Sequence, residues 1–394
     1  MLNTPKGFLF ATADGGFRKK PRNDTALVVS DRPCSAAGVF TLNRFCAAPV
    51  IVGKEILTQG PIASAVLVNS GQANACTGEQ GIENCHETLK LVAEALNIPE
   101  PRSILPASTG VIGEQFNMDK WRKVAPVLAQ NLGKNTATDF AEAILTTDAF
   151  KKMSSRHVNL AAGGITIMGM AKGAGMICPN MATMITVVLC DAEVEPDLWQ
   201  ALLNKSMEKT FNRVTVDGDT STNDTIYALA NGASGVKATE SDATALGEAL
   251  TTVLGELSYM LVQDGEGATK VLHINVDGAT SDNDAELVAR TIGHSPLVKT
   301  AMYGRDANWG RIVAAIGRSG ADFNPQNVRV SICGQEIFAQ GQPVDFDFDS
   351  VLEPLLKERD IQIDVILGTG QGKFQLLASD LTHAYIDCNA SYRS

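Results

Sequence analysis

The sequence predicts a layered α+β fold rather than a doubly wound parallel sheet. The expected strands and helices are interleaved, but they do not follow the strict order of repeated strand–helix–strand units. The length of 394 residues exceeds what one ordinary core needs, which predicts two domains or one large layered domain. Apolar residues make up 44% and charged residues 20%, which is the composition of a globular protein.

The first half of the chain alternates short apolar strands with turns before amphipathic helices appear. Runs rich in Val and Phe, bounded by Gly, Asp, Pro and Asn, indicate strands. Leucines and valines three or four residues apart indicate helices, and Pro196 suits a first helical turn. The expected strands are 25–30, 38–42, 64–69, 164–169 and 183–190, and the expected helices are 87–96, 119–132, 138–145 and 196–209.

The second half repeats this mixture after one long helix. Ser241 is the expected cap of that helix, which spans 242–262 and carries leucines along one face. A boundary is expected near residue 275, with a core of about 1–275 and a smaller domain of about 276–394. The remaining expected strands are 211–216, 271–276, 312–316, 328–332, 361–367 and 374–378, and the remaining expected helices are 285–292 and 351–358.

Charge and cysteine usage exclude several classes of protein. A formal net charge of −11 without a dense Lys/Arg stripe argues against nucleic-acid binding. No apolar run reaches the roughly 18 residues that span a bilayer, and the first residues do not resemble a secretory signal. The eight cysteines are scattered, with no histidine at zinc spacing. We therefore expect no metal site, no membrane partner and reduced thiols in the cytoplasm.

The step from Ala182 to Thr183 is the most informative feature of the chain. It lies between a loop rich in Gly and Pro and a β-branched apolar run. Cleavage before Thr183 would place a free α-amine beside its own hydroxyl, which is a recognised way to activate a weak oxygen nucleophile. On position alone the alternative is a threonine that simply begins a strand, as β-branched residues often do.

Three neighbouring features favour the nucleophile. Lys172 is a fixed cation upstream, and Thr109 with Gly110 offers a hydroxyl next to a flexible backbone N–H, as an oxyanion hole requires. The third feature is the run 217–224, which is unusually polar between two apolar segments, although the alternative for it is a solvated turn. Further along the chain, Glu266 lies between two glycines and is either a carboxylate aimed at a ligand or part of a helix stop.

Several long motifs together resemble one family of enzymes. In their given order they closely resemble the ornithine acetyltransferase (glutamate N-acetyltransferase, ArgJ) family of arginine biosynthesis, from about residue 5 to the C-terminus. The motifs are 69–78, 172–183, 211–224, 264–270, 304–311 and 389–394.

The resemblance implies a fold, a processing step and an assembly. The implied fold is an αββα-type core related to N-terminal-nucleophile hydrolases, with a second, smaller α/β domain. Self-cleavage between Ala182 and Thr183 would give an α chain of 1–182 and a β chain of 183–394. Two copies of each would form a heterotetramer.

The resemblance also implies the site and its reaction. Thr183 is the implied nucleophile, and Thr109 and Gly110 form the oxyanion hole. Thr183 takes the acetyl group of N2-acetylornithine and passes it to glutamate, without a cofactor. Ser394 replaces the usual threonine, and the choice between Thr146 and Thr147 stays open. The residues implied to bind substrate are Thr146, Lys172, Thr183, Glu266, Asn389 and Ser394.

Some alternatives stay open at this stage. Acetyl-CoA as a second acetyl donor would make the enzyme bifunctional, and the sequence does not decide this. A self-cleaving amidase or aminopeptidase of a related fold would hand the acyl group to water. A non-enzymatic amino-acid-binding protein with a decayed site would remain uncut.

Overall fold

The computed structural model describes residues 2–178, 184–345 and 347–391. The described chain forms two compact units. The first contains the chain up to Asn212 and the segment Thr220–Leu261. The second contains Arg213–Asp219 and the chain from Val262 onward. Each unit has its own sheet and its own hydrophobic core, and each is described by itself.

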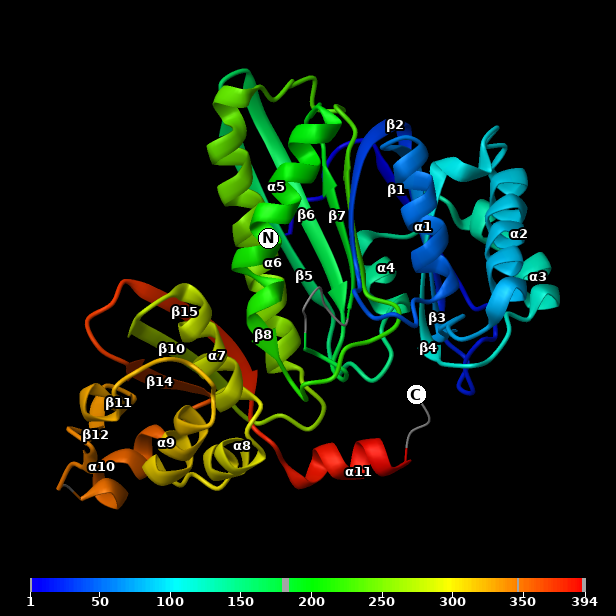
Figure 1. Cartoon of the computed structure of the whole chain (residues 1–394). Coiled ribbons are helices and arrows are strands. Elements are labelled where there is room, and N and C mark those ends of the chain that lie inside the picture. The colour runs from blue at the N-terminus through cyan, green and yellow to red at the C-terminus, as the bar shows by residue number, and fades with distance from the viewer. Residues whose placement is uncertain (1, 179–183, 346, 392–394) are drawn as a thin grey trace. The chain divides into compact units, whose positions relative to one another are not determined.

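The first unit is built on a mixed eight-stranded sheet in the order β4-β3-β2-β9-β7-β6-β5, with β1 paired to β2 (Figure 1). The long strand β2 pairs with β1 near its start and with β9 near its end, and its pairing with β3 shifts register between Val29 and Cys34. The pairs β3–β4 and β7–β9 are parallel. The strands are β1 Phe8–Ala13, β2 Thr25–Phe40, β3 Ile62–Gln72, β4 Ile104–Val111, β5 Lys152–Leu160, β6 Gly163–Lys172, β7 Ile185–Cys190 and β9 Thr225–Ala230.

Helices flank these strands on two sides and bury both faces of the central strands. In β7, Val187 and Leu189 join the core that contains α1–α4, whereas Val188 and Cys190 join the core that contains α5 and α6. Figure 1 shows α5 and α6 along β5–β7 and α1–α3 beside β1–β4. The predicted α+β class is therefore confirmed. The helices are α1 Ala48–Gln59, α2 Gly78–Leu96, α3 Met118–Asn131, α4 Ala137–Ala143, α5 Pro196–Lys209 and α6 Ala243–Gln263.

Helix α6 is the most apolar helix of the unit. By length and composition alone, the stretch Glu240–Gln263 could cross a membrane. Its leucines Leu246, Leu250 and Leu257 are instead fully buried against the strands of the first unit, so α6 is a core helix. Its start differs from the expectation, because Thr239 and Asp242 form a capping box where Ser241 was the expected cap.

The second unit is a seven-stranded mixed sheet in the order β13-β12-β11-β14-β10-β15-β8, with helices packed on it. Strand β8 comes from the early segment Arg213–Asp219 and pairs in parallel with β15. The strands are β8 Val214–Thr215, β10 Val271–Ala279, β11 Arg329–Ile332, β12 Gln335–Ala339, β13 Gln342–Pro343, β14 Asp360–Ile366 and β15 Gly372–Ser379, and the helices are α7 Asp282–Gly293, α8 Pro296–Tyr303, α9 Trp309–Gly317, α10 Phe348–Leu355 and α11 His383–Ser391.

Three sequence expectations about local structure were wrong. The expected strand 312–316 is part of α9, where the Asn308 side chain caps the helix by accepting the N–H of Arg311. The expected strand 211–216 is a short 3₁₀ turn followed by the two residues of β8. The expected strands 25–30 and 38–42 are the two ends of the single strand β2.

Candidate functional site

Two of the predicted site residues meet at one end of the first sheet. Lys172 is the last residue of β6, and Thr109 lies near the end of β4. The Lys172 Nζ donates a hydrogen bond of 3.4 Å to the Thr109 Oγ1. Only 8% of Lys172 is exposed, so its charge is largely removed from water. A cation and a hydroxyl held together under partial burial can stabilise negative charge on a bound group more strongly than they could in water.

Gly110, which follows Thr109, has a backbone that only glycine adopts without strain. Its φ is +133°, and a Cβ there would lie 2.2 Å from the carbonyl carbon of Gly71. The two glycines are partners in the parallel pairing of β3 with β4. The end of β4 therefore follows a path that needs a glycine beside the Thr109 hydroxyl.

The buried carboxylate of Asp148 contacts several chain segments next to this site. Its Oδ1 accepts the Gly173 N–H at 2.6 Å and the Lys152 Nζ at 2.7 Å, and its Oδ2 accepts the Thr146 N–H at 2.9 Å. The Lys172 Nζ lies 4.0 Å from the same Oδ2. Burial alone would raise the pKa of Asp148, but the charges of Lys172 and Lys152 and the hydrogen bonds hold it well below its usual range. Asp148 is therefore ionised.

Sequence reasoning gave Asp148 no role. Asp148 directly follows Thr146 and Thr147, and the one available signal in the sequence is the lysine four residues later, Lys152. The side chains of Asp148 and Lys152 are both fully buried. Thr146 also directs its hydroxyl to the Asp148 Oδ2 at 3.5 Å. The choice of Thr146 rather than Thr147 as the residue that faces a substrate stays a prediction.

The last part of the polar run 217–224 is buried, although a solvated turn was the alternative for it. The Asn223 Nδ2 donates to the carbonyl oxygens of Ala73 at 2.6 Å and Ser108 at 2.8 Å. Ser108 directly precedes Thr109, and Ala73 directly follows β3. Asn223 therefore ties together the two chain segments that carry Gly71 and Gly110.

Asp224 is a second buried carboxyl beside this network. Burial raises its pKa well above the usual range, although the Met184 N–H and the Lys172 charge oppose that rise. Its Oδ2 has no hydrogen-bond partner among the described residues. The charge of Lys172 lowers the pKa of both carboxyls, but burial outweighs it at Asp224, so the pKa of Asp224 is raised whereas that of Asp148 is lowered.

Asn223→Ala is expected to lower the free energy of unfolding by about 1–3 kcal/mol, because two buried carbonyl oxygens lose their donor. Urea unfolding of the purified variant measures this change. Asn204→Ala is the matched control, since Asn204 is exposed on α5 and should change stability by less than about 0.5 kcal/mol. Equal stability of the two variants would contradict the role given to Asn223.

Two other predicted residues lie together in the second unit. The Asn389 Nδ2, on α11, donates a 2.8 Å hydrogen bond to the Glu266 Oε2. Gly267 follows with a φ of +68°, and a Cβ there would lie 2.5 Å from the Tyr385 nitrogen. The loop that carries Glu266 therefore packs closely against the start of α11.

The predicted site residues thus fall into two described groups. Thr109, Gly110, Thr146 and Lys172 belong to the first unit, whereas Glu266 and Asn389 belong to the second. The other predicted residues, Ala182, Thr183 and Ser394, lie outside the described residues.

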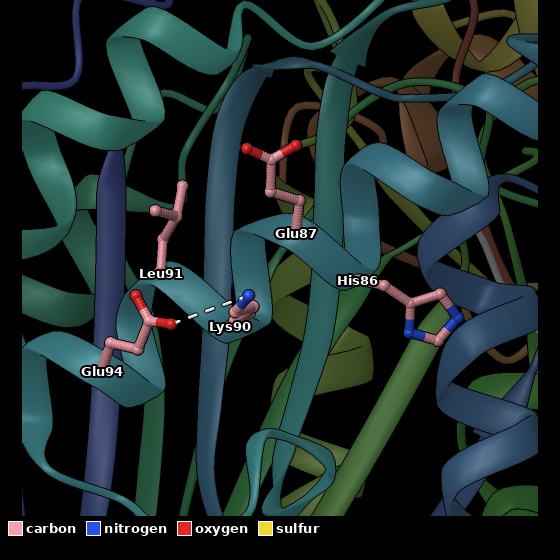
Figure 2. A pocket seen from close by; sticks show the side chains of 5 residues that line it. All are labelled: His86, Glu87, Lys90, Leu91 and Glu94. Carbon is pink, nitrogen blue, oxygen red and sulfur yellow. Dashed lines mark ion pairs between the residues drawn. The ribbon is translucent and has the colours of Figure 1, made fainter.

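Other parts of the described chain offer no comparable chemistry. Among the described residues, no group of three or more His, Cys, Asp or Glu side chains is placed to hold a metal ion. Figure 2 shows a hollow along α2, where Lys90 and Glu94 form a 3.9 Å ion pair. Both side chains are more than 60% exposed. Such surface pairs contribute little, and the hollow is a solvated helix face.

In this α+β fold a largely buried lysine contacts a hydroxyl at the ends of two strands, an arrangement that can stabilise the negative charge that develops in acyl transfer. A family model described as the ArgJ family matches residues 9–394, and the chain belongs to that family. The family resemblance found in the sequence is therefore confirmed.

One curated relative and two solved structures illustrate what the chain is similar to. The chain is 62% identical over 394 residues, the whole of both chains, to the arginine biosynthesis bifunctional protein ArgJ of Nitratidesulfovibrio vulgaris. Among solved structures, the ArgJ protein of Bacillus halodurans matches 51% of this chain and 96% of its own, with 38% identity and a TM-score of 0.48. The ornithine acetyltransferase of Mycobacterium tuberculosis, complexed with ornithine, matches 46% and 93%, with 36% identity and a TM-score of 0.42.

Proposed function

We propose that this chain, an acyltransferase of arginine biosynthesis, transfers an acetyl group from N2-acetylornithine to glutamate and releases ornithine and N-acetylglutamate. The observation that carries the proposal is membership of the ArgJ family over residues 9–394. The contact between Lys172 and Thr109 beside Gly110 adds a local reason, because it gathers the groups that such a transfer needs.

Thr183 is the proposed nucleophile, exposed by self-cleavage after Ala182. Its hydroxyl would attack the Ala182 carbonyl, an ester would form as the peptide nitrogen leaves, and water would release the first fragment. The products are chains of 1–182 and 183–394. The new α-amine has an ordinary pKa of about 7.7–8.0, so part of it is neutral near pH 7.5 and can act as a base.

The transfer then proceeds in two half-reactions. The Thr183 α-amine takes the hydroxyl proton while the oxygen attacks the acetyl carbonyl of acetylornithine. The negative charge that forms on the carbonyl oxygen is met by the Thr109 hydroxyl and the Gly110 N–H. The bond from carbon to the ornithine nitrogen breaks, the nitrogen takes up the proton, and the acetyl group stays on Thr183 as an ester. The glutamate amine attacks that ester in turn, which predicts ping-pong kinetics.

Charge suggests how the substrates are held. Lys172 suits the α-carboxylate that acetylornithine and glutamate share, and Glu266 suits the side-chain ammonium of ornithine. Asn389 already contacts Glu266 at 2.8 Å, which supports treating the two as one subsite. Thr146 and Ser394 complete the proposed binding residues, with the Ser394 hydroxyl serving where the family usually has threonine.

The wider setting of the enzyme is also proposed. The N. vulgaris relative is named bifunctional, and we extend that to this chain by proposing acetyl-CoA as a second donor, as a co-substrate rather than a cofactor. No disulfide joins the eight cysteines, all of which lie in the described part of the chain, and this suits a reducing cytoplasm. We propose a heterotetramer of two α and two β chains.

An acetyl-transfer assay tests the proposal. The purified protein receives glutamate with either acetylornithine or acetyl-CoA, and N-acetylglutamate and free acetate are measured separately. We expect N-acetylglutamate from acetylornithine and also from acetyl-CoA. Release of acetate without N-acetylglutamate would instead indicate an amidase or aminopeptidase, with water as the acceptor. Product from acetylornithine alone would limit the enzyme to one donor.

A further inference from the structure

We infer that Asp148 is a positioning residue, which holds Lys172 beside the Thr109 hydroxyl and fixes the start of the loop that leads to the proposed cleavage site. This inference rests on the proposed function, because it concerns how Lys172 receives a substrate carboxylate. Neither the family motifs identified in the sequence nor the proposed substrate contacts include Asp148.

The two carboxylate oxygens of Asp148 contact different groups. Oδ1 contacts the Lys152 Nζ at 2.7 Å and the Gly173 N–H at 2.6 Å. Oδ2 contacts the Thr146 N–H at 2.9 Å and faces the Lys172 Nζ at 4.0 Å. One side chain therefore links the loop after α4, the start of β5 and the end of β6, where the site lysine lies.

Charge balance explains why a carboxylate is needed at this position. Lys152 and Lys172 both lie against Asp148, and both are almost completely buried. Water screens charges weakly in the protein interior, so two buried ammonium groups repel each other strongly unless an anion lies between them. The charge of Lys172 lowers the pKa of both Asp148 and Asp224, but burial dominates at Asp224 and raises its pKa, whereas the pKa of Asp148 is held well below its usual range. Asp148 therefore supplies the negative charge that lets Lys172 approach Thr109.

Lys152 and Lys172 differ in how far each can serve a ligand. Lys152 and Lys172 contribute two cations, and Asp148 contributes one anion. Lys152 is fully buried and also donates to the Phe150 carbonyl oxygen, so its donors face the protein. Lys172 retains partial exposure and is the cation that a carboxylate of a substrate can reach. Without the Asp148 charge the two ammonium groups repel each other and Lys172 moves away from Thr109, so the loss should act mainly on substrate binding.

The test compares Asp148→Asn with Lys152→Met in the full-length, self-processed enzyme. Asparagine keeps the size of the side chain and an oxygen for the Gly173 N–H, but it carries no charge. We expect Asp148→Asn to raise the KM for glutamate and for acetylornithine about tenfold or more, with kcat within about threefold. Lys152→Met breaks the same buried ion pair but leaves the carboxylate to Lys172, so its KM should stay within about threefold of the wild type.

The two variants separate positioning from general stability. Both should lower Tm, because both disrupt the buried pair. Equal KM increases in the two variants would mean that the pair is only structural, and an unchanged KM in Asp148→Asn would mean that Asp148 does not position Lys172. Either result overturns the inference. A wild-type enzyme that transfers no acetyl group would refute the proposed function instead.

A double variant keeps the test decisive if Asp148→Asn fails to fold. Asp148→Asn combined with Lys152→Met replaces the whole ion pair with neutral groups of similar size, which buried sites often tolerate. This variant still lacks the charge that faces Lys172, so the tenfold rise in KM should persist. A KM equal to that of Lys152→Met alone would overturn the inference.

Discussion

Thr183→Ala is expected to remain a single chain of about 41.8 kDa and to transfer no acetyl group to glutamate. Without the hydroxyl, nothing attacks the Ala182 carbonyl, so the peptide bond is not cut. Without the cut, no α-amine is formed to act as the base. In the proposed mechanism both the processing and the transfer depend on the hydroxyl oxygen of Thr183, and this is why the expected effect is complete. Mass spectrometry and the acetyl-transfer assay measure the two outcomes on the same sample.

Thr186→Val is the matched control for this experiment. Thr186 is a fully buried threonine three residues further on, within β7, and its Oγ1 has no hydrogen-bond partner among the described residues. Valine has nearly the same shape, so this variant should be cut and active. An active Thr183→Ala protein would refute the assignment of Thr183 as the nucleophile. A wild-type enzyme that is active while still one unbroken chain would refute it as well.

The elements that the sequence predicted well are those with a strong local signal. The helices α3, α5 and α6 have long apolar stripes, and each was expected to within one residue at either end, whereas only the second half of α2 was expected. The error at 312–316 arose because Ile-Val-Ala-Ala-Ile is short and apolar, and such a run fits a strand as well as a helix. Strand β2 was divided because its middle, around Asp31 and Pro33, resembles a turn.

The geometry of the site could not be predicted from local pattern, because it depends on contacts between distant segments. Thr109 and Lys172 are 63 residues apart and meet only because the sheet brings β4 and β6 to a common end. Asp148 and Asp224 look like ordinary loop acids in the sequence, and only the fold shows that two lysines hold the pKa of Asp148 below its usual range whereas burial raises the pKa of Asp224. The sequence motifs indicated which residues belong to the site, whereas the fold shows which charged groups lie beside them.

Gly110→Ala is expected to lower kcat by about 10²–10³ through loss of an aligned oxyanion-hole donor. The physical reason is local, since an alanine Cβ would lie 2.2 Å from the Gly71 carbonyl carbon and 2.4 Å from its oxygen. Contacts this short force the end of β4 away from β3, and the Gly110 N–H moves with it. A φ of +133° adds strain for any residue with a side chain. Steady-state kinetics and thermal unfolding of the same preparation measure both effects.

Gly113→Ala is the control that distinguishes the effect of the Cβ clash at Gly110 from the effect of a positive φ alone. Gly113 lies three residues further along, has a φ of +87°, and has no atom within 4 Å of where its Cβ would be. Both variants therefore carry left-handed strain of about 1–2 kcal/mol, but only Gly110→Ala displaces a neighbouring strand. We expect Gly113→Ala to keep kcat within about threefold of the wild type. If a folded Gly110→Ala enzyme kept the same kcat, the Gly110 N–H could not be part of the oxyanion hole, and the Thr109 hydroxyl would have to stabilise the charge with a different partner.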